Sequence, residues 1–157
     1  KPNEGLFEGE TINTPSMLCV EDYLDALQWA KAVGGLDALI ARADANTKIL
    51  AGWVERTPWI DFLAKDPRTR SNTSVCLRFT DAAVAALPIE AQGAFAKNVA
   101  SLLEKEGAAY DIAYYRDAPP GLRIWCGATV EPADVEALLP WLEWAFASAK
   151  EALPKAA

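Results

Sequence analysis

Residues 114–127 read YYRDAPPGLRIWCG, and this stretch carries two arginines on either side of a proline-containing turn. Arg123 follows Gly121-Leu122 and opens the apolar run 124–126, which predicts a short, mostly buried strand. A guanidinium stays protonated and is costly to bury, so it needs either an internal carboxylate or an anionic ligand. Arg116 lies before the turn, and the two arginines could converge on one small molecule with two anionic ends. The residues alone leave both kinds of partner open.

Composition limits the classes of function. The chain has 157 residues, of which 52% are hydrophobic and 24% charged, as in one globular domain with a packed core. A net charge of −7 without a basic run argues against nucleic acid as a partner, because phosphate backbones need clustered Lys and Arg. Histidine is absent, so there is no Ser-His or Cys-His catalytic pair and no histidine ligand for a metal. We expect no metal site.

The cysteines and the N-terminal residues indicate a cytoplasmic protein. Three cysteines without a CxxC pair suit reduced thiols, and we expect each to be a small core residue. No apolar run approaches the ~20 residues of a membrane span, and residues 1–10 (KPNEGLFEGE) lack the apolar core of a signal peptide. Lys1 stands in place of an initiator Met, and the polar residues after it have the composition of a linker. We therefore expect a fragment of a longer chain.

Hydrophobic periodicity and turn residues predict two helices followed by the order β-β-α-β-β-α. Ser16 is expected to cap the first helix and Gly34-Gly35 to end it, and Pro140 is expected to kink the last one. The predicted helices cover residues 16–33, 36–56, 88–106 and 132 onward, and the predicted strands cover 59–64, 72–79, 109–114 and 122–127. This order indicates an α/β fold of the two-layer α+β kind, a small and mostly antiparallel sheet with helices packed on one face.

Four features together resemble one enzyme family. These are EGETINTPSMLCVEDYLDAL at residues 8–27, the break at Gly34-Gly35-Leu36, RSNTSV at residues 70–75, and the segment 116–127. Over nearly its whole length the chain resembles the C-terminal part of phosphoserine aminotransferase, in the form found in alphaproteobacteria. The resemblance implies the small domain of a homodimeric fold type I enzyme that depends on pyridoxal 5'-phosphate. Such an enzyme makes O-phosphoserine from 3-phosphohydroxypyruvate and glutamate in serine biosynthesis.

The resemblance also implies roles for four residues of this chain. Asn13 and Thr14 match the family residues that reach the cofactor phosphate of the opposite subunit, although on their own they suit a local Asx or Ser/Thr turn. Arg123 matches the arginine that binds the substrate α-carboxylate, and Arg116 matches the one that binds the substrate phosphate. At Arg116 the chain departs from the family pattern, because Tyr115 stands where the family has His and the following turn is one residue longer.

The family's remaining site residues lie upstream of this chain. The Schiff-base lysine, the ring-stacking aromatic and the aspartate on the pyridine nitrogen belong to the large domain, so we expect no catalytic residue here and no activity of the chain alone. The implied division is a linker and cofactor-phosphate segment at 1–15, a helical connection at 16–56 and a small domain at 57–157. The implied partners are the large domain and a second identical subunit.

Two alternatives remain open from the sequence. Another class V aminotransferase, such as an alanine-glyoxylate aminotransferase, would keep a carboxylate-binding arginine like Arg123 but would have no need of Arg116. A non-catalytic α/β binding or dimerisation module would instead pair both arginines with internal carboxylates.

Overall fold

The computed structural model describes residues 4–11 and 13–153 of the chain. The chain divides into two compact units, Lys1–Leu39 and Ile40–Ala157. The boundary falls within helix α2 (Gly35–Arg56), close to its first turn.

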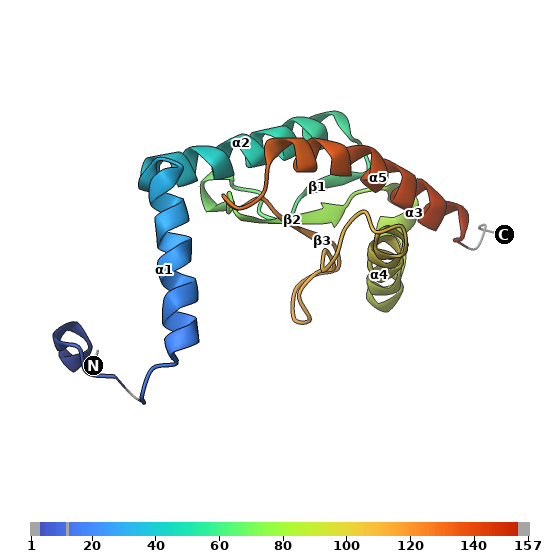
Figure 1. The fold of residues 1–157 in the computed structure, drawn as a ribbon. Helices are drawn as coiled ribbons and strands as arrows, with labels where there is room; N and C mark the ends of the chain where they lie inside the picture. The colour runs from blue at the N-terminus through green and yellow to red at the C-terminus, as the bar shows by residue number, and fades with distance from the viewer. Residues whose placement is uncertain (1–3, 12, 154–157) are drawn as a thin grey trace. The chain divides into compact units, whose positions relative to one another are not determined.

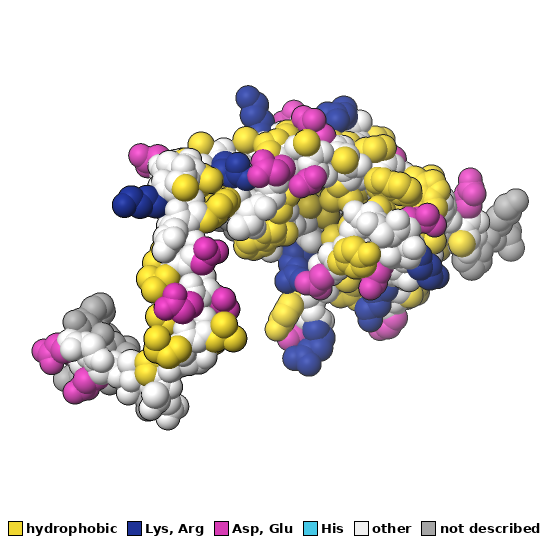
Figure 2. Space-filling view, viewed as in Figure 1, with side chains coloured by type: hydrophobic (Ala, Val, Ile, Leu, Met, Phe, Trp, Pro, Cys, Tyr) yellow, Lys and Arg dark blue, Asp and Glu magenta, His cyan; other side chains and the backbone are white. Residues whose placement is uncertain are grey.

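The first unit contains the 3-10 helix η1 (Glu4–Glu8) and helix α1 (Met17–Ala32). Ser16 caps α1 as expected, because its Oγ accepts a hydrogen bond from the backbone N–H of Cys19 at 3.5 Å. Gly34 and Gly35 both have positive φ, which lets the chain leave α1 and enter α2 within two residues. No residue of α1 is buried, and Leu18 is among its exposed apolar side chains. Apolar and acidic side chains both lie on its surface (Figure 2).

The second unit is built on a three-stranded antiparallel sheet in the order β1-β2-β3. The strands are β1 (Ile60–Phe62), β2 (Ser74–Phe79) and β3 (Leu122–Trp125). The register pairs Phe62 with Leu77 and Val75 with Ile124, so apolar side chains from all three strands share one buried face. The opposite face carries partly exposed polar side chains. The site residue Arg123 belongs to this second face.

Helices cover the apolar face of the sheet. The second unit contains η2 (Pro67–Thr69), α3 (Ala82–Ala85), α4 (Ile89–Lys105) and α5 (Pro132–Glu151) in addition to most of α2. Helices α2 and α5 lie together over the sheet (Figure 1), joined by a hydrogen bond from Trp53 Nε1 to the Glu143 carboxylate. The rings of Trp59 and Phe146 stack with centroids 3.9 Å apart. This core fixes the strands that carry the candidate site.

The predicted fold class is confirmed, but one predicted strand is wrong. Residues 109–114 do not form a strand, and only Ala113 forms an isolated bridge, with Leu122. The reason is local, because Asp111 has φ of 52° and a left-handed residue interrupts an extended run. The short helix α3 was not expected, and α5 continues through Pro140.

The expectation for the cysteines is correct for one of the three. Cys126 is buried, Cys76 is half-buried, and Cys19 is exposed on α1, a helix that has no buried residue. All three thiols are free. Within residues 4–11 and 13–153, no helix is long and apolar enough to cross a membrane. The same residues contain no group of three or more Cys, Asp or Glu side chains placed to hold a metal ion.

Candidate functional site

Arg123 is held by the sheet. It pairs with Cys76 of β2, and its neighbours Leu122 and Ile124 point into the core, which turns the arginine side chain to the open face. The backbone N–H of Arg123 donates to the carbonyl of Ile112 at 2.8 Å, on the free edge of β3. Its side chain is 32% exposed. The strand therefore fixes where the guanidinium projects.

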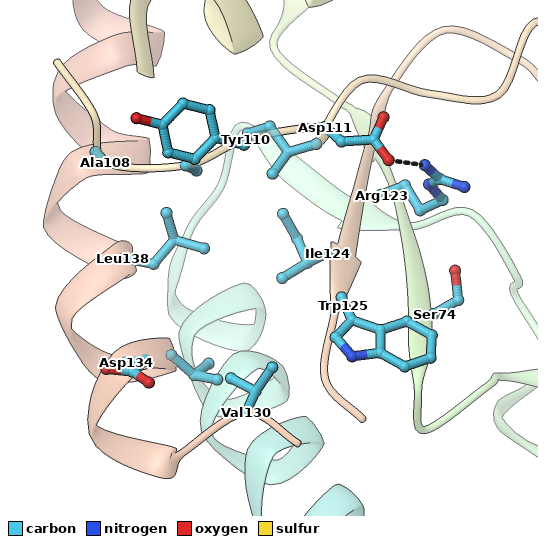
Figure 3. Close-up of a pocket in the computed structure, with 13 residues that line it drawn as sticks. Ser74, Ala108, Tyr110, Asp111, Arg123, Ile124, Trp125, Val130, Asp134 and Leu138 are labelled. Carbon is cyan, nitrogen blue, oxygen red and sulfur yellow. Dashed lines mark hydrogen bonds and ion pairs between the residues drawn. The ribbon is translucent and has the colours of Figure 1, made fainter. Parts of the chain in front are cut away.

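The partner of the guanidinium is an internal carboxylate. Arg123 Nη2 donates to Asp111 Oδ2 at 2.9 Å (Figure 3). Among the residues that the structure describes, this is the one hydrogen bond that the guanidinium makes, so most of its five N–H donors stay available. Asp111 is 88% exposed, and solvent weakens such a pair.

A cavity of about 450 Å³ lies beside this ion pair, at the edge of β3. Its walls come from β3, from the segment 108–112, from Ser74 of β2 and from the first turns of α5 (Figure 3). Tyr110 and Trp125 line it as exposed aromatic side chains, and Asp134 lines it at the start of α5. The cavity thus combines a partly free guanidinium with apolar and aromatic walls, which suits a small carboxylate ligand.

Buried contacts hold the loop that follows β3. Asn46 of α2 is fully buried, and its Nδ2 donates toward the carbonyls of Cys126, Gly127 and Val130 at 2.9–3.2 Å. Arg42 donates from Nε to the Ala128 carbonyl at 2.7 Å and also pairs with Glu131. These contacts fix the wall of the cavity that leads into α5.

The thiol at the end of β3 is structural. Burial raises the pKa of Cys126 from 9.0 to about 11, an effect only partly offset by a hydrogen bond with Thr47. A thiol with a raised pKa stays protonated at neutral pH and is a poor nucleophile. Cys126 therefore serves the packing of the strand end.

Arg116 lies in a different environment. It is on the turn between residues 114 and 121, its side chain is 87% exposed, and its Nε is 3.6 Å from Asp117 Oδ1. It lines a separate hollow of about 470 Å³ together with Lys97 and Tyr114. The cavity beside Arg123 does not include Arg116, and the hollow beside Arg116 does not include Arg123. Within the part of the chain that the structure describes, the two arginines thus line different hollows.

Gly121 joins the turn to β3 at a close backbone contact. A Cβ at this position would lie 1.9 Å from the Leu77 carbonyl oxygen, so no side chain fits. The turn that carries Arg116 therefore returns to the sheet at a fixed point, two residues before Arg123.

The other predicted site residues belong to the first unit. Asn13 and Thr14 are exposed, lie outside any helix and stand just before the Ser16 cap, whereas Ile12 lies outside the described residues. Their neutral side chains are accessible, and both can donate hydrogen bonds to a phosphate. The lysines at 31, 48, 65, 97, 105 and 150 are exposed, as expected for solvated faces, and Lys1 and Lys155 lie outside the described residues.

Sequence reasoning missed the residues that complete the cavity. Asp111 was placed inside a strand, and Tyr110, Ser74 and Trp125 were not singled out. The one available signal was Asp111, which is followed by the apolar Ile112 shortly before the turn that carries Arg116. This signal does not by itself predict a contact between Asp111 and Arg123, which are 12 positions apart.

No family model matches the chain. Curated relatives do match it: it is 48% identical over 146 residues to the phosphoserine aminotransferase of Methanosarcina barkeri and 31% identical over 137 residues to that of a Nocardioides species. These matches cover 93% and 87% of this chain, but only 37% and 34% of the relatives. The chain therefore spans a little over a third of the length of the curated relatives it matches.

Solved structures show the same fold at low identity. The phosphoserine aminotransferase from Bacillus circulans subsp. alkalophilus matches with a TM-score of 0.73 at 18% identity, over 92% of this chain and 36% of that one. A phosphoserine aminotransferase from Trichomonas vaginalis with bound pyridoxal phosphate matches with a TM-score of 0.70 at 16% identity, over 88% and 36%. Sequence and fold together confirm the resemblance read from the motifs: nearly the whole chain is homologous to one part of the phosphoserine aminotransferases.

Proposed function

We propose that this chain is the C-terminal part of a pyridoxal-phosphate-dependent phosphoserine aminotransferase. The complete enzyme would transfer an amino group between glutamate and 3-phosphohydroxypyruvate, giving O-phosphoserine and 2-oxoglutarate in the cytoplasm. The single observation that carries this function is Arg123, a strand-held guanidinium with free donors beside a cavity of about 450 Å³. The similarity to named phosphoserine aminotransferases over 93% of the chain supports it.

The chain's own contribution is substrate placement. Arg123 would bind the α-carboxylate through two parallel hydrogen bonds, a geometry that lysine cannot reproduce. Arg116 would bind the phosphate of phosphorylated substrates, and its exposure leaves it free to do so. Two anchors at opposite ends of one substrate would fix the bond between them relative to the cofactor.

Two described residues of this chain suit the phosphate group of the cofactor. Asn13 and Thr14 are exposed neutral donors, which suits the phosphate of pyridoxal phosphate. When bound, the cofactor would supply the electron sink for amino transfer, and the residues that hold its ring would come from the preceding domain. We propose that Asn13 and Thr14 serve the cofactor of the opposite subunit in a homodimer.

The proposed reaction is tested with the longer protein that contains this chain. We expect amino transfer from O-phosphoserine to 2-oxoglutarate with kcat/KM at least tenfold above that for alanine to glyoxylate. The expected factor follows from a phosphate anchor that strengthens binding by more than about 1.4 kcal/mol. Equal or better use of alanine would contradict the phosphoserine assignment.

A mixed dimer tests the role of Asn13 and Thr14. One subunit lacks the Schiff-base lysine, and the other carries Asn13→Ala with Thr14→Ala. Each of these two variants is expected to be severely impaired as a homodimer. In the mixed dimer, the site built on the intact lysine receives wild-type Asn13 and Thr14 from its neighbour, so one site in two should recover. Background activity in a heterodimer confirmed by mass would rule out the contact across the interface.

One observation favours a second function. Arg116 lies outside the cavity of Arg123, as in an aminotransferase that binds a carboxylate but no phosphate. An alanine-glyoxylate type of enzyme is therefore the second candidate. The comparison of phosphoserine with alanine as amino donor separates the two.

A further inference from the structure

Asp111 accepts a hydrogen bond from the Arg123 guanidinium, the group that would bind the substrate carboxylate. We propose that Asp111 is an internal competitor, a carboxylate that holds Arg123 in the free protein and is displaced when a substrate carboxylate binds. This inference rests on the proposed function of Arg123 as the carboxylate anchor. Its basis is the pair between Arg123 Nη2 and Asp111 Oδ2 at 2.9 Å, formed by two residues that line the same cavity (Figure 3).

The two members of the pair differ in how firmly they are held. The Arg123 side chain is 32% exposed and projects from a strand whose neighbouring side chains are buried. The Asp111 side chain is 88% exposed, so it can rotate into water and lose little solvation or packing. When a ligand arrives, Asp111 is therefore the member that leaves.

Arg123 does not need Asp111 for its position. Its backbone is fixed on one side by the pairing with Cys76 and on the other by the hydrogen bond to the Ile112 carbonyl at 2.8 Å. The backbone of Asp111 lies next to that contact in a left-handed conformation, with φ of 52°. Movement of the carboxylate consequently requires a side-chain rotation and leaves the strand edge intact.

The donor geometry of the guanidinium makes the two carboxylates exclusive. A carboxylate that binds through two parallel hydrogen bonds uses Nη2 together with either Nε or Nη1. Asp111 already accepts from Nη2, so a substrate would have to share this nitrogen or displace Asp111. Sharing would place two negative charges side by side, which disfavours the shared state.

Displacement reduces the apparent affinity for every carboxylate ligand, because part of the binding free energy is used to break the internal pair. Removing the Asp111 charge should therefore tighten binding. For an exposed ion pair the expected gain is about two- to fivefold in Kd.

The test uses the longer protein with its cofactor and measures glutarate binding by calorimetry. Glutarate carries two carboxylates, either of which can bind Arg123, and it has no amino group to react. Asp111→Asn keeps the size of the side chain and suits the left-handed backbone, and it should bind glutarate about two- to fivefold more tightly than wild type. Asp111→Gly also suits a positive φ and provides a second variant should the first fail to fold.

Asp134→Asn is the matched control. Asp134 lines the same cavity from the first turn of α5, so its replacement removes the same charge from the same space without touching Arg123 (Figure 3). We expect its Kd for glutarate to stay close to that of wild type, clearly below the change of about two- to fivefold expected for Asp111→Asn. Equal tightening in Asp134→Asn and Asp111→Asn would overturn the inference, because the effect would then be one of general charge.

The remaining outcomes separate this inference from the proposed function. If Arg123→Ala abolishes glutarate binding and Asp111→Asn leaves it unchanged or weaker, the anchor stands and the competitor is disproved, since Asp111 would then be neutral or would help to orient the arginine. If Arg123→Ala leaves glutarate binding intact, the proposed anchor itself is wrong and the inference falls with it.

Discussion

Arg123 and Arg116 are seven positions apart, and the structure treats them very differently. Arg123 projects from a strand between two buried side chains, with 32% of its side chain exposed. Arg116 projects from a turn, is 87% exposed, and pairs with its sequence neighbour Asp117 at 3.6 Å. The strand fixes the direction in which the Arg123 guanidinium projects, whereas the turn leaves the Arg116 guanidinium exposed to solvent.

The difference predicts unequal energetic roles. A side chain held in place loses little conformational entropy when it binds, so most of its interaction energy appears as affinity. A free arginine must lose that freedom first, at a cost of up to about 2 kcal/mol. We therefore expect Arg123 to dominate substrate binding and Arg116 to adjust its specificity.

The largest expected effect comes from Arg123→Ala in the longer protein. Truncation would leave the substrate carboxylate unpaired. For every amino acid substrate, kcat/KM should therefore fall by a factor that corresponds to a loss of about 2–5 kcal/mol in transition-state binding. Arg123→Lys should recover only part, because it offers no planar fork. Steady-state kinetics with glutamate and phosphoserine measure both variants.

Near-normal kcat/KM in Arg123→Ala would contradict the expectation that Arg123 contributes more to substrate binding than Arg116. Arg123 would then be a structural partner of Asp111, and the ion pair would be its whole purpose. Thermal unfolding of the same variant provides the control, because loss of an exposed pair should cost no more than about 1 kcal/mol.

A smaller and more selective effect is expected for Arg116→Ala. If Arg116 binds phosphate, kcat/KM for phosphoserine and 3-phosphohydroxypyruvate should fall by a factor that corresponds to about 1.5–3 kcal/mol of transition-state binding. The value for glutamate should change much less. Lys97→Ala is a useful companion, because Lys97 lines the same hollow as Arg116. Equal losses for phosphorylated and unphosphorylated substrates would indicate that Arg116 supports the turn and not the substrate.

The third prediction concerns the buried end of the strand that holds Arg123. The pKa of Cys126 is about 11 in the folded chain and near 9.0 when unfolded, so between these values the folded state binds more protons. Stability should therefore fall as pH rises from about 9 to about 11, by on the order of 2 kcal/mol from this group.

Urea unfolding at pH 8 and pH 10.5 measures this effect. Other groups titrate in the same range, so the comparison is between wild type and Cys126→Ala, which should lose less stability over the same interval. An identical decrease in both proteins would show that the strand end is open to solvent and that Arg123 is less firmly held than the fold indicates.

The sequence predicted the strand of Arg123 well, because apolar side chains on both sides of one charged residue leave little choice of orientation. The same reasoning failed at residues 109–114. Ala109 and Ile112 look like strand residues, but a left-handed Asp111 interrupts the segment, and no composition signal distinguishes a left-handed aspartate from an extended one.

The partner of Arg123 was also beyond sequence reasoning. An internal carboxylate was one of two options, but the chain has 22 acidic residues and no local rule selects Asp111 among them. The choice depends on the bridge between Ala113 and Leu122, which brings residues 12 positions apart to the same strand edge. The cavity has the same origin, since its walls come from four separate segments.

The smallest expected effect concerns the exposed turn that carries Arg116. Asp117→Asn removes the carboxylate beside Arg116, and because both side chains are highly exposed and 3.6 Å apart, the pair should contribute little. We expect the free energy of unfolding to change by less than about 0.5 kcal/mol, as for ordinary surface substitutions. Urea unfolding of the chain measures this value. A loss above about 1 kcal/mol would mean that the turn is organised by its own ion pair, and Arg116 would then be held as firmly as Arg123.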